Sequence, residues 1–206
     1  IRARDLTFTA LDQDSTHVTM RLKDATRGCL DIIYALQPDG YMLTMDVRAT
    51  GMQDVFPTST KTLNIQWIDR AYQQEKGFDF ENRYASLTYK KAKGGTDYLS
   101  ETQEESESPE QALDWVAFKN QFFSCVLIAH QDFTHADLKS VPEQKGTGFL
   151  KTYRADLQTA FDPTGAQPTQ LQLYIGPNDF HLLQEANEQG TVKKDLELEE
   201  LVYLGW

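Results

Sequence analysis

Two histidines that lie five positions apart in a polar stretch are the residues most able to do chemistry. His130 and His135 are accompanied by Asp132 and Asp137, and imidazole and carboxylate groups are common zinc ligands. A zinc site also requires a third and fourth ligand that converge on the ion. Because surface histidines in a turn explain the same spacing, the sequence favours surface residues over a metal site.

No motif of a known catalytic machinery is present elsewhere. The sequence contains no Gly-x-Ser-x-Gly elbow, no glycine-rich phosphate loop and no His-Glu-x-x-His pair. Aspartates and glutamates number 31, so pairs at suggestive spacing arise by chance, and Glu110, Asp114 and Asp156 cannot be assigned as acid and base. We therefore expect no catalytic, cofactor-binding or metal-binding residues.

Two cysteines, Cys29 and Cys125, allow either one disulfide or two free thiols. Free cysteine is among the residues most often buried, so two buried thiols in separate strands are the simpler interpretation. The count does not indicate a redox compartment.

The composition restricts the class of protein. Twenty basic and 31 acidic residues give a net charge of -11, which opposes binding to nucleic acid or to an anionic membrane surface. The hydrophobic fraction of 40% is enough for a core, and 206 residues fit a single β-rich domain. No run of about 18 apolar residues, the length that spans a bilayer, is present.

An acidic, serine-rich tract covers residues 100–111 and contains five glutamates. Such tracts bury too little apolar surface to offset the entropy of ordering, so we expect a solvated loop without a site. A cation site is the alternative, but the tract lacks the alternating Asp or Asn and the fixed Gly of a calcium loop.

Apolar and polar residues alternate along most of the chain, which predicts nine or ten short strands. The segment 75–82 is a helical turn or a loop, and 130–148 is expected to be a polar connection with at most a short helix. The expected strands cover 4–10, 16–22, 29–36, 41–48, 63–67, 85–91, two segments within 114–129 that separate near Lys119-Asn120, 149–161 and 171–175.

One convincing helix follows the last strand. Gly176 permits a turn, Pro177 suits the first helical position, and Asn178 or Asp179 can cap the helix before Gly190 ends it. Because strands and helices do not alternate, we expect a mostly β fold, a large antiparallel β-sandwich with a C-terminal helix.

The final residues are apolar and acidic and end on Gly205-Trp206 without a polar tail. Leu196, Leu198 and Leu201 should pack on the sandwich or meet a lipid interface. Together with Ile1 at the start, this ending suggests a segment cut from a longer protein.

Three segments occur in a fixed order: Trp115-Val116-Ala117 followed by Gln121-Phe122-Phe123, then Leu173-Tyr174-Ile175-Gly176-Pro177 before a helix, then Leu204-Gly205-Trp206. Together they resemble the periplasmic domain of the bacterial membrane protein insertase YidC, and the composition is similar to a Bacteroidetes-like member.

The resemblance implies a β-supersandwich of the galactose mutarotase-like kind. It also implies a non-catalytic accessory domain, without cofactors, on the periplasmic side of the inner membrane. The full-length insertase and chaperone would act on nascent membrane proteins, alone or with the Sec translocon. This chain would be a monomer that contacts the membrane only through flanking segments, with a sandwich over 1–190 and a linker over 191–206.

Particular residues carry expected roles in this interpretation. Trp115, Phe122 and Phe123 should pack in the core. The other motif residues, expected to be structural, are Gln121, Tyr174, Gly176 and Pro177. The membrane-proximal linker would contain Leu201, Tyr203, Gly205 and Trp206.

Two other functions fit the same fold class. A mutarotase-like carbohydrate-binding or carbohydrate-active protein would need a histidine and a carboxylate that converge in a cleft. A free-standing periplasmic or surface interaction protein would use the acidic tract as its binding element.

Overall fold

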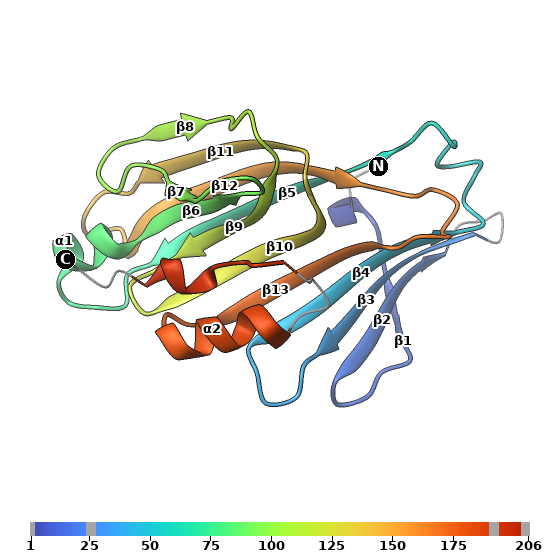
Figure 1. Ribbon diagram of the computed structural model, residues 1–206, viewed down its shortest axis with the longest axis horizontal. Coiled ribbons are helices and arrows are strands. Elements are labelled where there is room, and N and C mark those ends of the chain that lie inside the picture. Colours follow the sequence, from blue (N-terminus) through green and yellow to red (C-terminus); the bar gives the residue numbers. More distant parts are fainter. Residues whose placement is uncertain (1–2, 24–27, 190–193, 203–206) are drawn as a thin grey trace.

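Two antiparallel sheets stacked face to face form the body of the protein (Figure 1). The computed structural model describes residues 3–23, 28–189 and 194–202. One sheet has nine strands and the other four, and all of their pairings are antiparallel. The expected antiparallel sandwich is thereby confirmed.

The elements have the following bounds. The large sheet holds, in spatial order, β1 (Thr9–Leu11), β2 (His17–Lys23), β3 (Cys29–Leu36), β4 (Met42–Thr50), β13 (Thr169–Pro177), β10 (Phe123–Phe133), β9 (Leu113–Lys119), β6 (Ser86–Lys91) and β7 (Thr96–Tyr98). The small sheet holds β5 (Thr62–Tyr72), β12 (Phe149–Ala160), β11 (His135–Pro142) and β8 (Glu105–Glu107). The helices are α1 (Phe78–Tyr84), α2 (Phe180–Gln189) and the 3-10 helices η1 (Ala3–Asp5) and η2 (Leu198–Leu201).

The period-two pattern of the strands builds the core. Alternate residues of β12, such as Tyr153, Ala155 and Leu157, point at the large sheet and meet Val116 and Leu127 in the main hydrophobic cluster. We call the side of the large sheet that faces the small sheet its inner face. The outer face carries a second cluster, which α2 and η2 cover (Figure 1).

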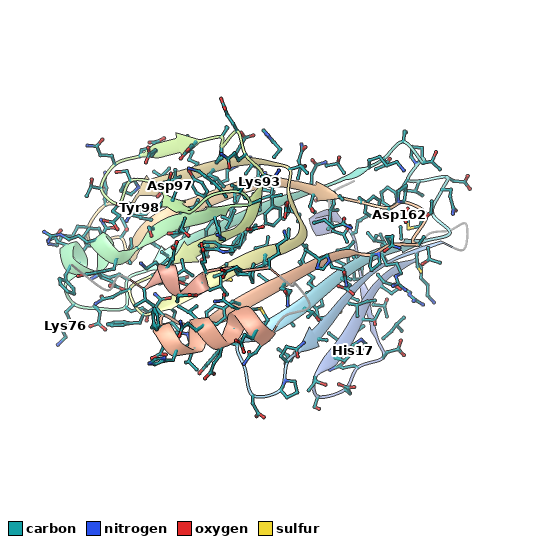
Figure 2. The ribbon with its side chains drawn as sticks, in the orientation of Figure 1. His17, Lys76, Lys93, Asp97, Tyr98 and Asp162 are labelled. Atoms are coloured by element: carbon teal, nitrogen blue, oxygen red, sulfur yellow. The ribbon has the colours of Figure 1, made fainter. Side chains whose placement is uncertain are left out.

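Several expected elements are confirmed. The hairpin over 29–36 and 41–48 forms β3 and β4, and the apolar stretch 114–129 forms β9 and most of β10. The ambiguous segment 75–82 contributes to α1. Asp162 lies in the turn after β12 (Figure 2). Its carboxylate accepts hydrogen bonds from the amides of Thr164 and Gln167, both at 2.9 Å.

The prediction of a strand over 4–10 is wrong. Residues 3–5 form η1, and β1 begins only at Thr9, which pairs with Arg21. Among the described residues, β1 is an edge strand that pairs with β2. Before it, the amide of Leu6 donates to the carbonyl of Ala3 at 3.1 Å, so the backbone there forms a local turn instead of a strand.

The prediction of a polar connection over 130–148 is also wrong. β10 continues to Phe133, and β11 covers His135–Pro142. Ala136, Leu138 and Ser140 are buried at alternate positions, but one of these side chains is small and another is polar. The inward face of β11 therefore carried little hydrophobic signal.

The sequence predicted a solvated loop for the whole acidic tract, and this prediction is wrong for part of it. Glu105–Glu107 form β8, which pairs with β11 from Leu138↔Glu107 to Ser140↔Glu105. Main-chain pairing at a sheet edge needs no apolar side chain, and charged residues are typical of edge strands.

The last strand ends two residues later than the expected end at residue 175. β13 includes Gly176 and Pro177, and α2 begins at Phe180, so Pro177 is not its first residue. Asp179 is the cap, because its Oδ1 accepts hydrogen bonds from the amides of His181 and Leu182, both at 3.0 Å. Gly190, the expected end of the helix, lies outside the described residues.

Both cysteines are free and half-buried, Cys29 in β3 and Cys125 in β10, which agrees with separate thiols. The described part of the chain contains no helix that is long and apolar enough to cross a membrane.

Candidate functional site on the outer face of the large sheet

The first two motif segments meet at Asn178, between β13 and α2. The hydroxyl of Ser124 donates to Asn178 Oδ1 at 2.6 Å, and Asn178 Nδ2 donates to the carbonyl of Asn120 at 2.8 Å. The Asn178 amide donates to the carbonyl of Phe122 at 2.7 Å. The turn between β9 and β10 is thus fixed to the end of β13. Sequence reasoning considered Asn178 only as a helix cap.

Gly176 is required by close packing. A Cβ at this position would lie 2.7 Å from the Tyr41 ring and 2.8 Å from the Tyr174 ring. The Tyr174 hydroxyl donates to the carbonyl of Pro177 at 2.6 Å, and burial raises its pKa to about 12. The sequence suggested that Gly176 permits a turn, whereas the structure shows that it leaves room for two aromatic rings.

Trp115 joins the third segment to the sheet. Its side chain is fully buried on the outer face, and Nε1 donates to the carbonyl of Leu196 at 2.7 Å. Leu196, Leu198 and Leu201 are buried in the same cluster. The expectation that these leucines pack on the sandwich is confirmed, whereas Tyr203, Gly205 and Trp206 lie outside the described residues.

Ion pairs hold the segment before η2 on both sides. The ammonium of Lys90 lies 2.6 Å from Glu197 Oε2. Lys194 contacts Asp114 at 3.0 Å and also Asp132. Burial disfavours the Lys194 ammonium, but its hydrogen bonds to the two carboxylates outweigh burial and raise its pKa.

Asn187 of α2 links the helix to η2. Its Oδ1 accepts the amide of Leu198 at 3.1 Å, and its Nδ2 donates to Glu199 at 2.7 Å. No local pattern in the sequence predicts these contacts.

The prediction that Phe122 and Phe123 pack in the core is wrong. Their side chains are 51% and 61% exposed, because they lie in the turn and at the first residue of β10, where the sheet ends. Gln121 is half-buried, and its Oε1 lacks a hydrogen-bond partner among the described residues.

The histidines lie apart from one another and do not occupy turns. His130 belongs to β10 and His135 to β11, where His135 Nε2 lies 3.2 Å from Asp137 Oδ2. His17 begins β2 (Figure 2), and His181 is exposed in α2 as expected. Within the described ranges, no group of three or more His, Cys, Asp or Glu residues could hold a metal ion.

The candidate carboxylates also do not converge. Asp114 pairs with Lys194 on the large sheet, whereas Asp156 lies on the small sheet and contacts Arg154 and Gln66. Glu110 is exposed between β8 and β9. These three side chains therefore provide no acid and base around a shared space.

A depression of about 550 Å³ lies between α2 and η2. None of its lining residues is Trp, Tyr or Phe, the rings on which a sugar could stack. The lining residues are His181, Gln184, Glu185, Asn187, Glu188, Lys194, Asp195 and Glu199.

Comparison with known proteins gives a family model that matches residues 3–206 and is described as the YidC periplasmic domain. Proteins named membrane protein insertase YidC are 52% identical in Phocaeicola vulgatus, 44% in Bacteroides fragilis and 31% in Porphyromonas gingivalis. Each of these alignments covers 100% of this chain and 33% of the relative, so the chain spans about a third of their length.

The solved structures that match this chain are distant in sequence. A galactose mutarotase related enzyme from Lactobacillus acidophilus has a TM-score of 0.46 and 10% identity, over 84% of this chain and 72% of that one. The GH36 alpha-galactosidase AgaA from Geobacillus stearothermophilus has a TM-score of 0.46 and 10% identity, over 92% and 28%.

Proposed function

This chain belongs to the YidC periplasmic domain family, and from that premise we propose that it is the non-catalytic accessory domain of a membrane protein insertase. The observation that carries the proposal is the family match over residues 3–206, supported by the relative that is 52% identical over the whole chain. The full-length protein would insert and fold inner-membrane proteins, and this domain would lie on the periplasmic side. Its partners, through the full-length protein, would be Sec translocon components and nascent membrane proteins.

A role without catalysis is supported by the placement of the titratable groups. Asp114 is engaged by Lys194 on the large sheet, and His135 contacts Asp137 on the small sheet. A mutarotase-like reaction needs a histidine and a carboxylate that converge in an enclosed cleft, whereas the side chains of the His135–Asp137 pair are 49% and 56% exposed. We expect this chain to leave the anomerisation rate of aldoses at the buffer value, as measured by NMR.

We also propose that residues 1–190 form the sandwich unit and that 191–206 lead from it toward the membrane. The burial of Leu196, Leu198 and Leu201 supports a rigid start to this linker. In this arrangement Leu201, Tyr203, Gly205 and Trp206 are membrane-proximal.

The test compares the full-length protein with a form that lacks residues 3–189, both reconstituted in liposomes with Sec translocon components. For an accessory domain, we expect insertion of a single-span membrane protein to persist and crosslinks to the translocon to decrease. Protease protection controls for correct assembly of the membrane part. Loss of all insertion in a correctly assembled deletion form would contradict an accessory role.

A further inference from the structure

The inner face of the large sheet extends beyond the small sheet. β5 is the edge of the small sheet on the side of β3, β4 and β13 (Figure 1). Beyond that edge lie Leu36, Leu43, Phe123 and Ile175, which we call the open face. Residues paired across neighbouring strands lie on the same side of a sheet. Leu36 pairs with Leu43, and Leu43 pairs with Leu173, which faces the core. Phe123 and Ile175 lie on this side too, because they are next to Ser124 and Tyr174, which face outward.

The open face is apolar and accessible to solvent. Leu36, Ile175 and Phe123 are 54%, 57% and 61% exposed, and Leu43 is half-buried. Single exposed apolar residues are ordinary, but a group on one side of adjacent strands is typical of a binding surface. The outer face of the same strands instead carries polar residues such as Thr44 and Gln172, or is covered by α2.

The edge that borders this face is long and unpaired. β5 has eleven residues and pairs only with β12 among the described residues. Natural edge strands are usually protected by proline, by bulges or by charged residues. β5 contains neither lysine nor proline, and its charged residues Asp69 and Arg70 and the register shift opposite Phe149 and Lys151 all lie toward its C-terminal end. Its free backbone donors and acceptors can therefore pair with another extended chain.

A carboxylate lies where this edge meets the open face. Asp69 pairs with the inward-facing Tyr153, so its side chain points toward the large sheet. It lies close enough to Cys125, the partner of Ile175, to add to burial in raising the pKa of that thiol to about 11. Asp69 is exposed and has no ion pair among the described residues.

We propose that β5 receives an extended segment of another polypeptide as an added strand. The backbone of the segment pairs with the free edge of β5, and alternate apolar side chains lie on Leu36, Leu43, Ile175 and Phe123. A lysine or arginine on the same side of the segment pairs with Asp69. This docking goes beyond the proposed accessory role and does not depend on it.

The probe is a synthetic peptide of eleven residues, the length of β5, in which valine alternates with threonine and one central valine is lysine. Binding to this chain is measured by fluorescence anisotropy. Because each of these side chains would bury its exposed apolar surface against the peptide, Ile175→Ser or Phe123→Ser should weaken binding about tenfold. Ile68→Ser is the matched control, since Ile68 is 51% exposed on the same edge strand but faces outward beside Arg154.

Two further arms test the backbone and the charge. Asp69→Lys should weaken binding of the peptide with the central lysine. The same variant should bind a second peptide, in which glutamate replaces that lysine, more tightly than the wild-type chain does. Two peptides are N-methylated, one at the odd and one at the even residues, so that each lacks the backbone N–H donors along one edge. The peptide methylated along the edge that faces β5 should lose binding, and the other should retain it. Equal binding by both forms, or an equal loss with Ile68→Ser, would overturn strand addition. A wild-type chain that sediments as a dimer and binds no peptide would show that a second copy occupies β5, contrary to the proposal.

Discussion

Lys151 is a cation inside the sandwich. Its side chain is fully buried, and its ammonium donates hydrogen bonds to the carbonyls of Asn82 and Ala85 at the end of α1. It therefore satisfies carbonyls that have no partner within the helix. Burial, opposed in part by Glu101, lowers its pKa to about 8.

This shift makes stability depend on pH. The unfolded lysine has a pKa of about 10.4, so between pH 8 and 10 the unfolded chain binds more protons than the folded chain, and stability rises with pH in that window. We expect Lys151→Met to flatten this rise. Urea unfolding of both proteins at pH 7, 8.5 and 9.5 measures the difference, and identical slopes would refute this role for Lys151.

The close packing around Gly176 leaves no room for a larger residue. Gly176→Ala should lower the free energy of unfolding by about 1–3 kcal/mol, because the added methyl group overlaps two rings in a filled space. Gly95→Ala is the control, since nothing lies within 4 Å of a Cβ there. Comparable losses in both variants would show that close packing is not the cause.

η2 covers part of the outer face of the large sheet. Leu198→Ala should cost about 2–5 kcal/mol, the usual range for a buried leucine, because Leu198 is fully buried against the outer face. Glu200→Ala, at an exposed position of the same helix, should be close to neutral. Ending the chain before Leu196 should increase hydrogen exchange in β9 and β10 while the cluster between the sheets stays protected. Complete unfolding would show that the cap is essential to the sandwich.

β8 makes the acidic tract part of the fold. Replacing residues 105–107 with Gly-Pro-Gly removes the pairing with β11, at about 1 kcal/mol for each hydrogen bond lost. The melting temperature should fall by about 2–4 °C for each kcal/mol lost in a domain of this size. The same replacement at 101–103, which pair with no strand, is the control. Equal melting temperatures would restore the view of the tract as a solvated loop.

Sequence patterns predicted an element where its inward residues are large and apolar, as in the hairpin of β3 and β4. They missed β8, which backbone pairing alone defines, and β11, whose inward positions include Ala136 and Ser140. At the candidate site, the motif residues could be identified, but not the bond between Trp115 and Leu196, which joins positions 81 apart. Contacts of this kind depend on how the sheets pack, which no local pattern encodes.

At the scale of the whole molecule, β13 joins the two parts of the large sheet. It lies between β4 and β10, so strands β1–β4 on one side and β6, β7, β9 and β10 on the other share a sheet only through it. A chain that ends at residue 168 should therefore lack a single cooperative unfolding transition. Calorimetry of that fragment beside the whole chain measures this, and an intact cooperative transition would contradict the central role of β13.

The position of β13 also sets the order of events during synthesis. The strand that completes the large sheet is made after the twelve strands that precede it. Until residue 177 has emerged, β4 and β10 each present an unpaired edge, and such edges invite wrong pairing or aggregation. With so many contacts between distant positions, closure of the sheet should be slow. A holding factor that shields those two edges would therefore be needed most in the interval just before residue 177 emerges.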